Sequence, residues 1–133
     1  MSCHIATSTA ATQYASALAQ NAAEVEALPG LRADGSQSIK SLSIRSRENL
    51  AWQIELLDET GNILSSHAFA TTDATVKTIS EVPYYFYTYT PPEEWCVPHT
   101  KDYQTDIAVR NLSAESKTAG SDGELVLYIK YCA

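Results

Sequence analysis

Residues 50–56 read Leu-Ala-Trp-Gln-Ile-Glu-Leu, a stretch in which every second residue is large and apolar. In an extended chain the apolar residues, from Leu50 to Leu56, lie on one side and the residues between them on the other. This period of two predicts a β-strand with one face in a core and one polar face. The turn-forming residues 58–62 follow, and residues 63–70 are expected to form the returning strand of a hairpin.

Further strands are predicted on both sides of this hairpin. Residues 42–45 alternate in the same way, and β-branched or aromatic residues fill 75–79 and 84–89. Residues 91–104 contain three prolines and are predicted to be a long loop, followed by strands near 107–112 and 125–131. About seven to eight short strands with turn signals between them predict a mostly β protein. Its expected architecture is an antiparallel β-sandwich or jelly roll over residues 38–133.

The first 37 residues have a different texture and are predicted to form an N-terminal arm. They are rich in Ala, Ser, Thr and Gln, and Glu24 and Glu26 are the only charges before Arg32. The apolar positions Tyr14, Leu18, Ala22, Val25 and Leu28 follow helical spacing, so a helix is expected over about residues 10–28, followed by a linker. Because a short isolated helix is marginal in water, this one needs a surface, either its own sheet or a partner protein.

Length and charge exclude several classes of function. The chain has 133 residues, enough for one domain, and 16 acidic against 9 basic residues give a net charge of −7. This acidic balance argues against nucleic acid as a partner and against a polybasic membrane contact. The uncharged residues 1–23 are too polar for a transmembrane helix and lack the pattern of a signal peptide.

Three cysteines, Cys3, Cys96 and Cys132, are present. An odd count without a secretory signal predicts free thiols and a reducing cytoplasm. The alternative is a disulfide through Cys3 or Cys132, since both lie near chain ends that can meet a neighbouring subunit.

The sequence predicts no enzyme, no metal site and no cofactor. Cys96 and His99 have a spacing that zinc accepts, but a second pair of ligands is missing, and no Asn or Asp is evident to orient a catalytic dyad. Glu93 and Glu94 are adjacent, which rarely places two carboxylates across a glycosidic bond. Signature motifs of hydrolases, metalloproteases and nucleotide-binding proteins are absent from the chain.

The aromatic strand at 84–89 has two different faces. Tyr85, Tyr87 and Tyr89 share one face, and Tyr84 and Phe86 share the other with Thr88. One face is expected in the core, and the other is a candidate subunit interface or sugar-stacking platform. The residues predicted to bind a partner come from the arm, this strand and the following loop: Tyr14, Leu18, Val25, Leu28, Tyr85, Tyr87, Tyr89 and Trp95.

Two stretches carry a resemblance to a known class of proteins. Residues 46–56 read Ser-Arg-Glu-Asn-Leu-Ala-Trp-Gln-Ile-Glu-Leu, and residues 105–120 are followed by the strand 123–129. Together they resemble small β-sandwich proteins of tailed bacteriophages, which decorate or join parts of the virion. The resemblance covers residues 39–133 at most and brings no catalytic motif with it.

The resemblance implies a non-enzymatic structural protein of the virion, assembled in the host bacterial cytoplasm. The expected function is that of a capsid decoration protein, with the major capsid protein or another virion protein as partner. A homo-oligomer is expected, with a trimer as the simplest fit to a capsid axis. The alternatives are a carbohydrate-binding module with a glycan as ligand, a head–tail connector, and a tail protein.

Overall fold

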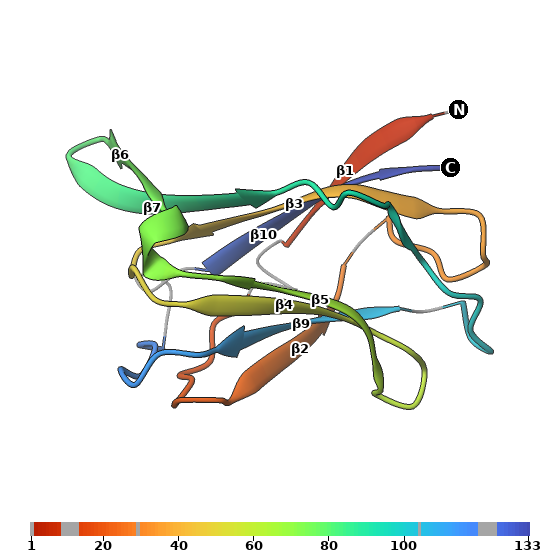
Figure 1. The fold of residues 1–133 in the computed structure, drawn as a ribbon, viewed down its shortest axis with the longest axis horizontal. Helices are drawn as coiled ribbons and strands as arrows, with labels where there is room; N and C mark the ends of the chain where they lie inside the picture. Colours follow the sequence, from red (N-terminus) through yellow and green to blue (C-terminus); the bar gives the residue numbers. More distant parts are fainter. Residues whose placement is uncertain (1, 9–13, 29, 104, 120–124) are drawn as a thin grey trace.

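The computed structural model describes residues 2–8, 14–28, 30–103, 105–119 and 125–133, and their strands form two antiparallel sheets (Figure 1). The first sheet has the order β1-β10-β3-β7-β6, and the short β8 pairs with one end of β3. Its strands are β1 (Cys3–Thr7), β10 (Leu125–Cys132), β3 (Ser38–Ser46), β7 (Val82–Tyr89), β6 (Thr75–Ile79) and β8 (Trp95–Cys96). The second sheet has the order β2-β9-β4-β5. Its strands are β2 (Ala23–Ala27), β9 (Asp106–Asn111), β4 (Trp52–Leu57) and β5 (Ile63–Phe69).

The core lies between the two sheets, which form the upper and lower layers in Figure 1. Trp52, Ile54 and Leu56 of β4 are fully buried on the second sheet, and Ile44 and Leu127 face them from the first. The period of two predicted for residues 50–56 therefore has its apolar side in the core. The fold class is confirmed as a mostly β, antiparallel sandwich, and a short 3₁₀ turn, Thr71–Asp73, links the sheets.

The helix predicted over residues 10–28 is wrong in the part that the structure describes, and residues 10–13 lie outside that part. Residues 23–27 form β2, which pairs with β9 in the second sheet, and β1 pairs with β10 in the first. The described parts of the first 37 residues therefore contribute a strand to each sheet and do not form a separate arm. The physical reason is that a weak isolated helix competes with an open edge of β9, which offers a full ladder of backbone hydrogen bonds.

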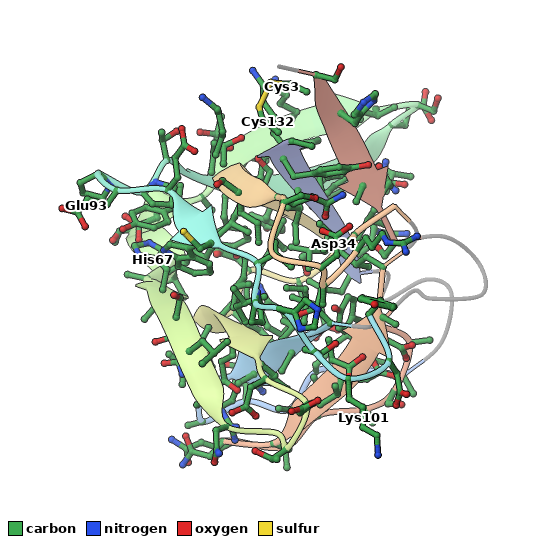
Figure 2. All side chains as sticks on the ribbon, turned by 90° about the vertical axis from the view of Figure 1, so that its right-hand side faces the viewer. Cys3, Asp34, His67, Glu93, Lys101 and Cys132 are labelled. Atoms are coloured by element: carbon green, nitrogen blue, oxygen red, sulfur yellow. A yellow bond between two sulfur atoms is a disulfide. The ribbon has the colours of Figure 1, made fainter. Side chains whose placement is uncertain are left out.

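The prediction of free thiols is also wrong for two of the three cysteines. Cys3 and Cys132 form a disulfide that joins the two ends of the chain (Figure 2). Cys96 is free and exposed. The two cysteines lie opposite each other in the β1–β10 ladder, whereas the neighbouring pair Ser2 and Ala133 exchanges both backbone hydrogen bonds. Cys3 and Cys132 are thus a non-hydrogen-bonded pair, the position where Cα atoms of antiparallel strands lie closest. The argument from free thiols for a reducing compartment therefore no longer holds.

We expect removal of this disulfide to lower the free energy of unfolding by about 2–4 kcal/mol, because it closes nearly the whole chain into one loop. The measurement is urea unfolding of the oxidised protein and of the double variant Cys3→Ser/Cys132→Ser. The variant Cys96→Ser is the control and is expected to unfold as the parent does. Equal stability of the parent and the double variant would contradict the prediction.

Candidate functional site

Strand β7 decides which aromatic side chains face the core. Tyr87 is fully buried, and its hydroxyl lies 2.7 Å from Asn49 Oδ1 and 3.1 Å from the Leu50 carbonyl oxygen. Burial raises the pKa of Tyr87 to about 12. Tyr85 and Tyr89 lie on the same side and are half-buried against the core. Tyr87 therefore has no accessible surface for a partner, which corrects its assignment as a contact residue.

The opposite side of β7 faces outward and carries Tyr84, Phe86 and Thr88. Three basic side chains lie over the aromatic rings of this side. The guanidinium carbons of Arg45 and Arg47 are 5.1 and 5.5 Å from the Tyr84 centroid, and Lys77 Nζ is 5.3 Å from that of Phe86. Cations at these distances are attracted to the ring faces. The outward side of β7 is therefore a mixed cationic and aromatic surface.

Charge is distributed unequally between the two sheets. The strands of the first sheet contain the basic residues Lys40, Arg45, Lys77 and Lys130 and no acidic residue. The strands of the second sheet contain four acidic residues, Glu24, Glu26, Glu55 and Asp106, and Arg110 as their single Lys or Arg. The charged residues are visible in the sequence. Their separation into a basic sheet and an acidic sheet becomes visible only when each strand is assigned to its sheet.

A hollow of about 480 Å³ opens where β5, β7 and β8 approach one another. It is lined by Ser65, Tyr89, Trp95 and the loop residues 91–94. His67 of β5 stacks on Tyr89 with their ring centroids 3.5 Å apart, which links the two sheets at this point. Burial lowers the pKa of His67, and Asp73 opposes this effect. Figure 2 shows His67 and Glu93 on the same side of the molecule.

Trp95, predicted to bind a partner, is largely buried at the base of this hollow. It pairs with Ile39 in the β3–β8 ladder and its ring centroid is 6.3 Å from that of Tyr89. Its position agrees with the role of hydrophobic anchor for the proline-rich loop. Only a small part of the indole is accessible, so Trp95 serves mainly to hold residues 91–97 against the sandwich.

The four predicted contact residues of the N-terminal segment separate into two groups. Tyr14, Leu18 and Leu28 are buried in the core, which corrects their assignment to a partner interface. The Tyr14 hydroxyl donates a 2.8 Å hydrogen bond to the Ile107 carbonyl oxygen, and burial, with nearby Glu26, raises the pKa of Tyr14. Val25 is exposed on the outward side of β2 and is the only one of the four that a partner can reach.

Two buried ionisable groups were not anticipated from the sequence. Glu55 is almost completely buried on β4, and Arg110 of β9 binds both of its oxygens, with Nε–Oε2 at 2.8 Å and Nη2–Oε1 at 3.1 Å. Lys117 is buried as well, and its Nζ donates to the carbonyl oxygens of Ser16 and Thr118. Burial lowers the pKa of Lys117. Both groups join distant segments of the chain and stabilise the fold.

In the described part of the chain, the candidate catalytic and metal-binding residues from the sequence do not form a catalytic or metal-binding site. Cys96 pairs with Ser38 and His99 with Asp34, so the two residues lie opposite different places along the facing segment. No group of three or more His, Cys, Asp or Glu in the described ranges is arranged to hold a metal ion. A helix long and apolar enough to cross a membrane is likewise not found in these ranges.

Comparison with known proteins gives weak likenesses only. No family model and no curated protein matches the sequence. Among solved structures, the enzymatically active domain of tailspike protein 4 of bacteriophage CBA120 is 10% identical, with a TM-score of 0.38. The alignment covers 97% of this chain and 19% of the tailspike chain. VP2 in a subviral particle of infectious bursal disease virus is 12% identical, with a TM-score of 0.33, over 98% of this chain and 40% of that one.

This chain thus spans about a fifth of the tailspike chain and two-fifths of VP2. TM-scores this low do not carry the role of either viral protein over to this chain.

Proposed function

We propose that this chain is a non-enzymatic structural subunit of a tailed-phage virion, a capsid decoration protein that binds the major capsid protein and oligomerises. The resemblance of residues 39–133 to small virion β-sandwich proteins supports the virion as its location. The sandwich architecture fits this role, because its core holds the fold together while sheet edges and faces remain available to partners.

The observation that carries the proposal is the projecting hairpin of β6 and β7. Every residue of β6 is exposed, including Val76 and Ile79, whose side chains retain 55% and 46% of their accessible area. In the described part of the chain β6 pairs only with β7, so its other edge is open. Figure 1 shows this hairpin extending from the upper layer, at the end of the molecule opposite the termini.

An open edge of this kind is suited to binding another protein chain. Its unpaired backbone N–H and C=O groups can accept an added strand, and the exposed apolar side chains add burial on contact. Natural proteins usually protect such an edge with charges, prolines or bulges, and β6 has Lys77 as its single charge and no proline. We therefore place the contact with the virion partner at β6.

The test is co-sedimentation of the purified protein with phage capsids assembled without it. The full chain is expected to sediment with the capsids, and the double variant Val76→Lys/Ile79→Lys is expected to lose at least about tenfold in affinity, because it charges and solvates the open edge. The control is Ile63→Lys, which changes a similarly exposed apolar residue on β5 of the other sheet.

Two results would contradict the proposal. Failure of the full chain to bind capsids would remove the virion role itself. If the β6 variant and the Ile63→Lys control lost affinity for capsids equally, the chain would still be a capsid-binding protein, but β6 would not be its binding site. Circular dichroism of each variant establishes that the sandwich is retained.

A further inference from the structure

Strand β1 is the outermost strand of the first sheet, on the edge opposite β6. In the described part of the chain it pairs only with β10, so its other side is open, and Figure 1 shows it beside the chain ends and away from the β6–β7 hairpin. Ile5 keeps 67% of its accessible area, the highest value among the large apolar side chains of the described ranges. The strand has no Lys, Arg, Asp, Glu or Pro and no bulge in its ladder, so it lacks the usual devices that prevent pairing with another chain.

The ladder with β10 determines which backbone groups of β1 point to the open side. Ser2 and Ala133 exchange two backbone hydrogen bonds. Because hydrogen-bonded and non-hydrogen-bonded pairs alternate along an antiparallel ladder, the even-numbered residues of β1 bond to β10. The N–H and C=O groups of Cys3, Ile5 and Thr7 therefore point away from β10, toward the open side.

These backbone groups match those of a second copy of the chain in one two-fold register. When Ile5 lies opposite the second copy's Ile5, Cys3 lies opposite Thr7 and Thr7 lies opposite Cys3. Every one of these pairs joins residues whose N–H and C=O groups point to the shared side, so each pair can exchange two hydrogen bonds. A shift by one residue would set these groups opposite residues that already bond to β10. The two exposed Ile5 side chains also meet in this register and bury each other.

Charge distinguishes β1 from the other edge strands as a site for a second copy. The same two-fold pairing would set Lys77 opposite Lys77 on β6, and Glu24 opposite Glu26 on β2, and like charges in opposite positions destabilise a strand pair. Strand β5 is uncharged, but Leu64 has no partner in its ladder with β4, and this bulge interrupts the edge. Lys130, the charged residue of β10, would lie three strand spacings from its counterpart, roughly 14 Å, which exceeds the screening length of about 8 Å at physiological salt.

We propose that two copies of this chain join at β1 in this two-fold register, so that their first sheets form one continuous sheet. A second copy fits this edge because β1 is compatible with itself in charge, in backbone hydrogen bonding and in the position of Ile5. A contact of this kind is isologous and closes at two copies. In the dimer the two β6 strands lie at opposite outer edges of the continuous sheet, where both remain available to another partner. The inference rests on the oligomerisation in the proposed function, gives it a site, and does not depend on capsid binding.

The test is sedimentation velocity of the oxidised full chain, without capsids, over a concentration series that extends to about 1 mM. A contact along one short strand is small, so we expect a dimer that dissociates on dilution, with a dissociation constant on the order of 10–100 μM. Ile5→Lys and Ile5→Glu are each expected to weaken dimerisation by at least about tenfold. Each substitution removes the apolar contact and sets two like charges opposite each other at the two-fold axis.

A mixture of the Ile5→Lys and Ile5→Glu variants tests the register itself. The mixture is expected to dimerise about tenfold more tightly than either variant alone, because lysine and glutamate then lie opposite each other. Val25→Lys is the matched control, because it makes the same charge change at an exposed apolar residue on the edge strand β2, and it is expected to stay within about twofold of the parent. Circular dichroism of each variant verifies that the sandwich is retained, since Ile5 and Val25 both lie outside the core.

Each other result overturns the proposal. A full chain that stays monomeric throughout the series forms no β1 contact, and a trimer is incompatible with an isologous pair. If Val25→Lys weakens association as much as Ile5→Lys, the effect reflects net charge and not this edge. If the mixture is no tighter than its components, the two copies do not meet at Ile5. Since no capsid enters the experiment, failure of the β1 contact and failure of the virion role are distinguished.

Discussion

Replacing Tyr14 with alanine is expected to lower the free energy of unfolding by about 3–5 kcal/mol, the range found when a large buried side chain is truncated. Tyr14 is fully buried between the sheets and its hydroxyl donates to the Ile107 carbonyl oxygen at 2.8 Å. The variant loses apolar burial, leaves a cavity and removes this hydrogen bond. Urea unfolding followed by tryptophan fluorescence measures the difference, because Trp52 lies in the same core.

Val25→Ala is the matched control, because Val25 comes from the same N-terminal segment but is exposed on β2. Its effect is expected to stay within about 0.5 kcal/mol, as for most surface substitutions. Tyr14→Phe keeps the packing and removes only the hydroxyl, so a loss of about 1 kcal/mol is expected. Near-equal stabilities of Tyr14→Ala and Val25→Ala would show that the N-terminal segment is not part of the core.

Replacing Arg110 with methionine is expected to lower the free energy of unfolding by about 3 kcal/mol, because it leaves the Glu55 carboxylate buried without its cation. Arg110 makes two hydrogen bonds to Glu55 and a third, of 2.6 Å, to the Asn21 carbonyl oxygen. The hydrogen bonds to Glu55, together with its negative charge, raise the pKa of Arg110. The measurement is again chemical unfolding at neutral pH.

The double variant Arg110→Met/Glu55→Met separates the lost cation from lost packing. Removing both charges is expected to restore most of the stability. Replacing a buried ion pair with apolar groups of similar size often leaves the free energy of unfolding almost unchanged. Lys101→Met serves as a control for loss of a basic residue in an exposed loop. If the double variant were as unstable as Arg110→Met, the buried carboxylate would not be the cause.

Strands were predicted from the sequence by alternation in residues 50–56, by the following turn for residues 63–70, and by β-branched or aromatic content in 75–79 and 84–89. Residues 50–57 gave β4, residues 63–70 gave β5, and residues 75–79 and 84–89 gave β6 and β7 within a residue or two. These segments carry their signal locally, because alternation, turn residues and β-branched or aromatic side chains favour extended strands within a short stretch of sequence. The proline-rich loop predicted at 91–104 is observed over its described residues, 91–103, apart from the two residues of β8.

The N-terminal segment could not be assigned in this way. The positions of Tyr14, Leu18 and Leu28 match a helical stripe by spacing, yet all three enter the core from extended or irregular backbone. Local sequence cannot distinguish a helix from a strand here, because the outcome depends on pairing with the edge of β9, which lies 79 to 87 residues further along the chain. The disulfide was missed for the same reason, since Cys3 and Cys132 meet only after β1 pairs with β10.

The sequence by itself indicated an acidic, mostly β sandwich, because alternation, turns and charge balance can be read from neighbouring residues. Only the tertiary structure decided which side of each strand became surface. For β7, Tyr85, Tyr87 and Tyr89 went to the core because they face the second sheet, and Tyr84 and Phe86 were left outside beneath Arg45, Arg47 and Lys77. Pairing between strands distant in sequence gathered basic side chains on one face and acidic strands on the other sheet, and no local pattern encodes that division.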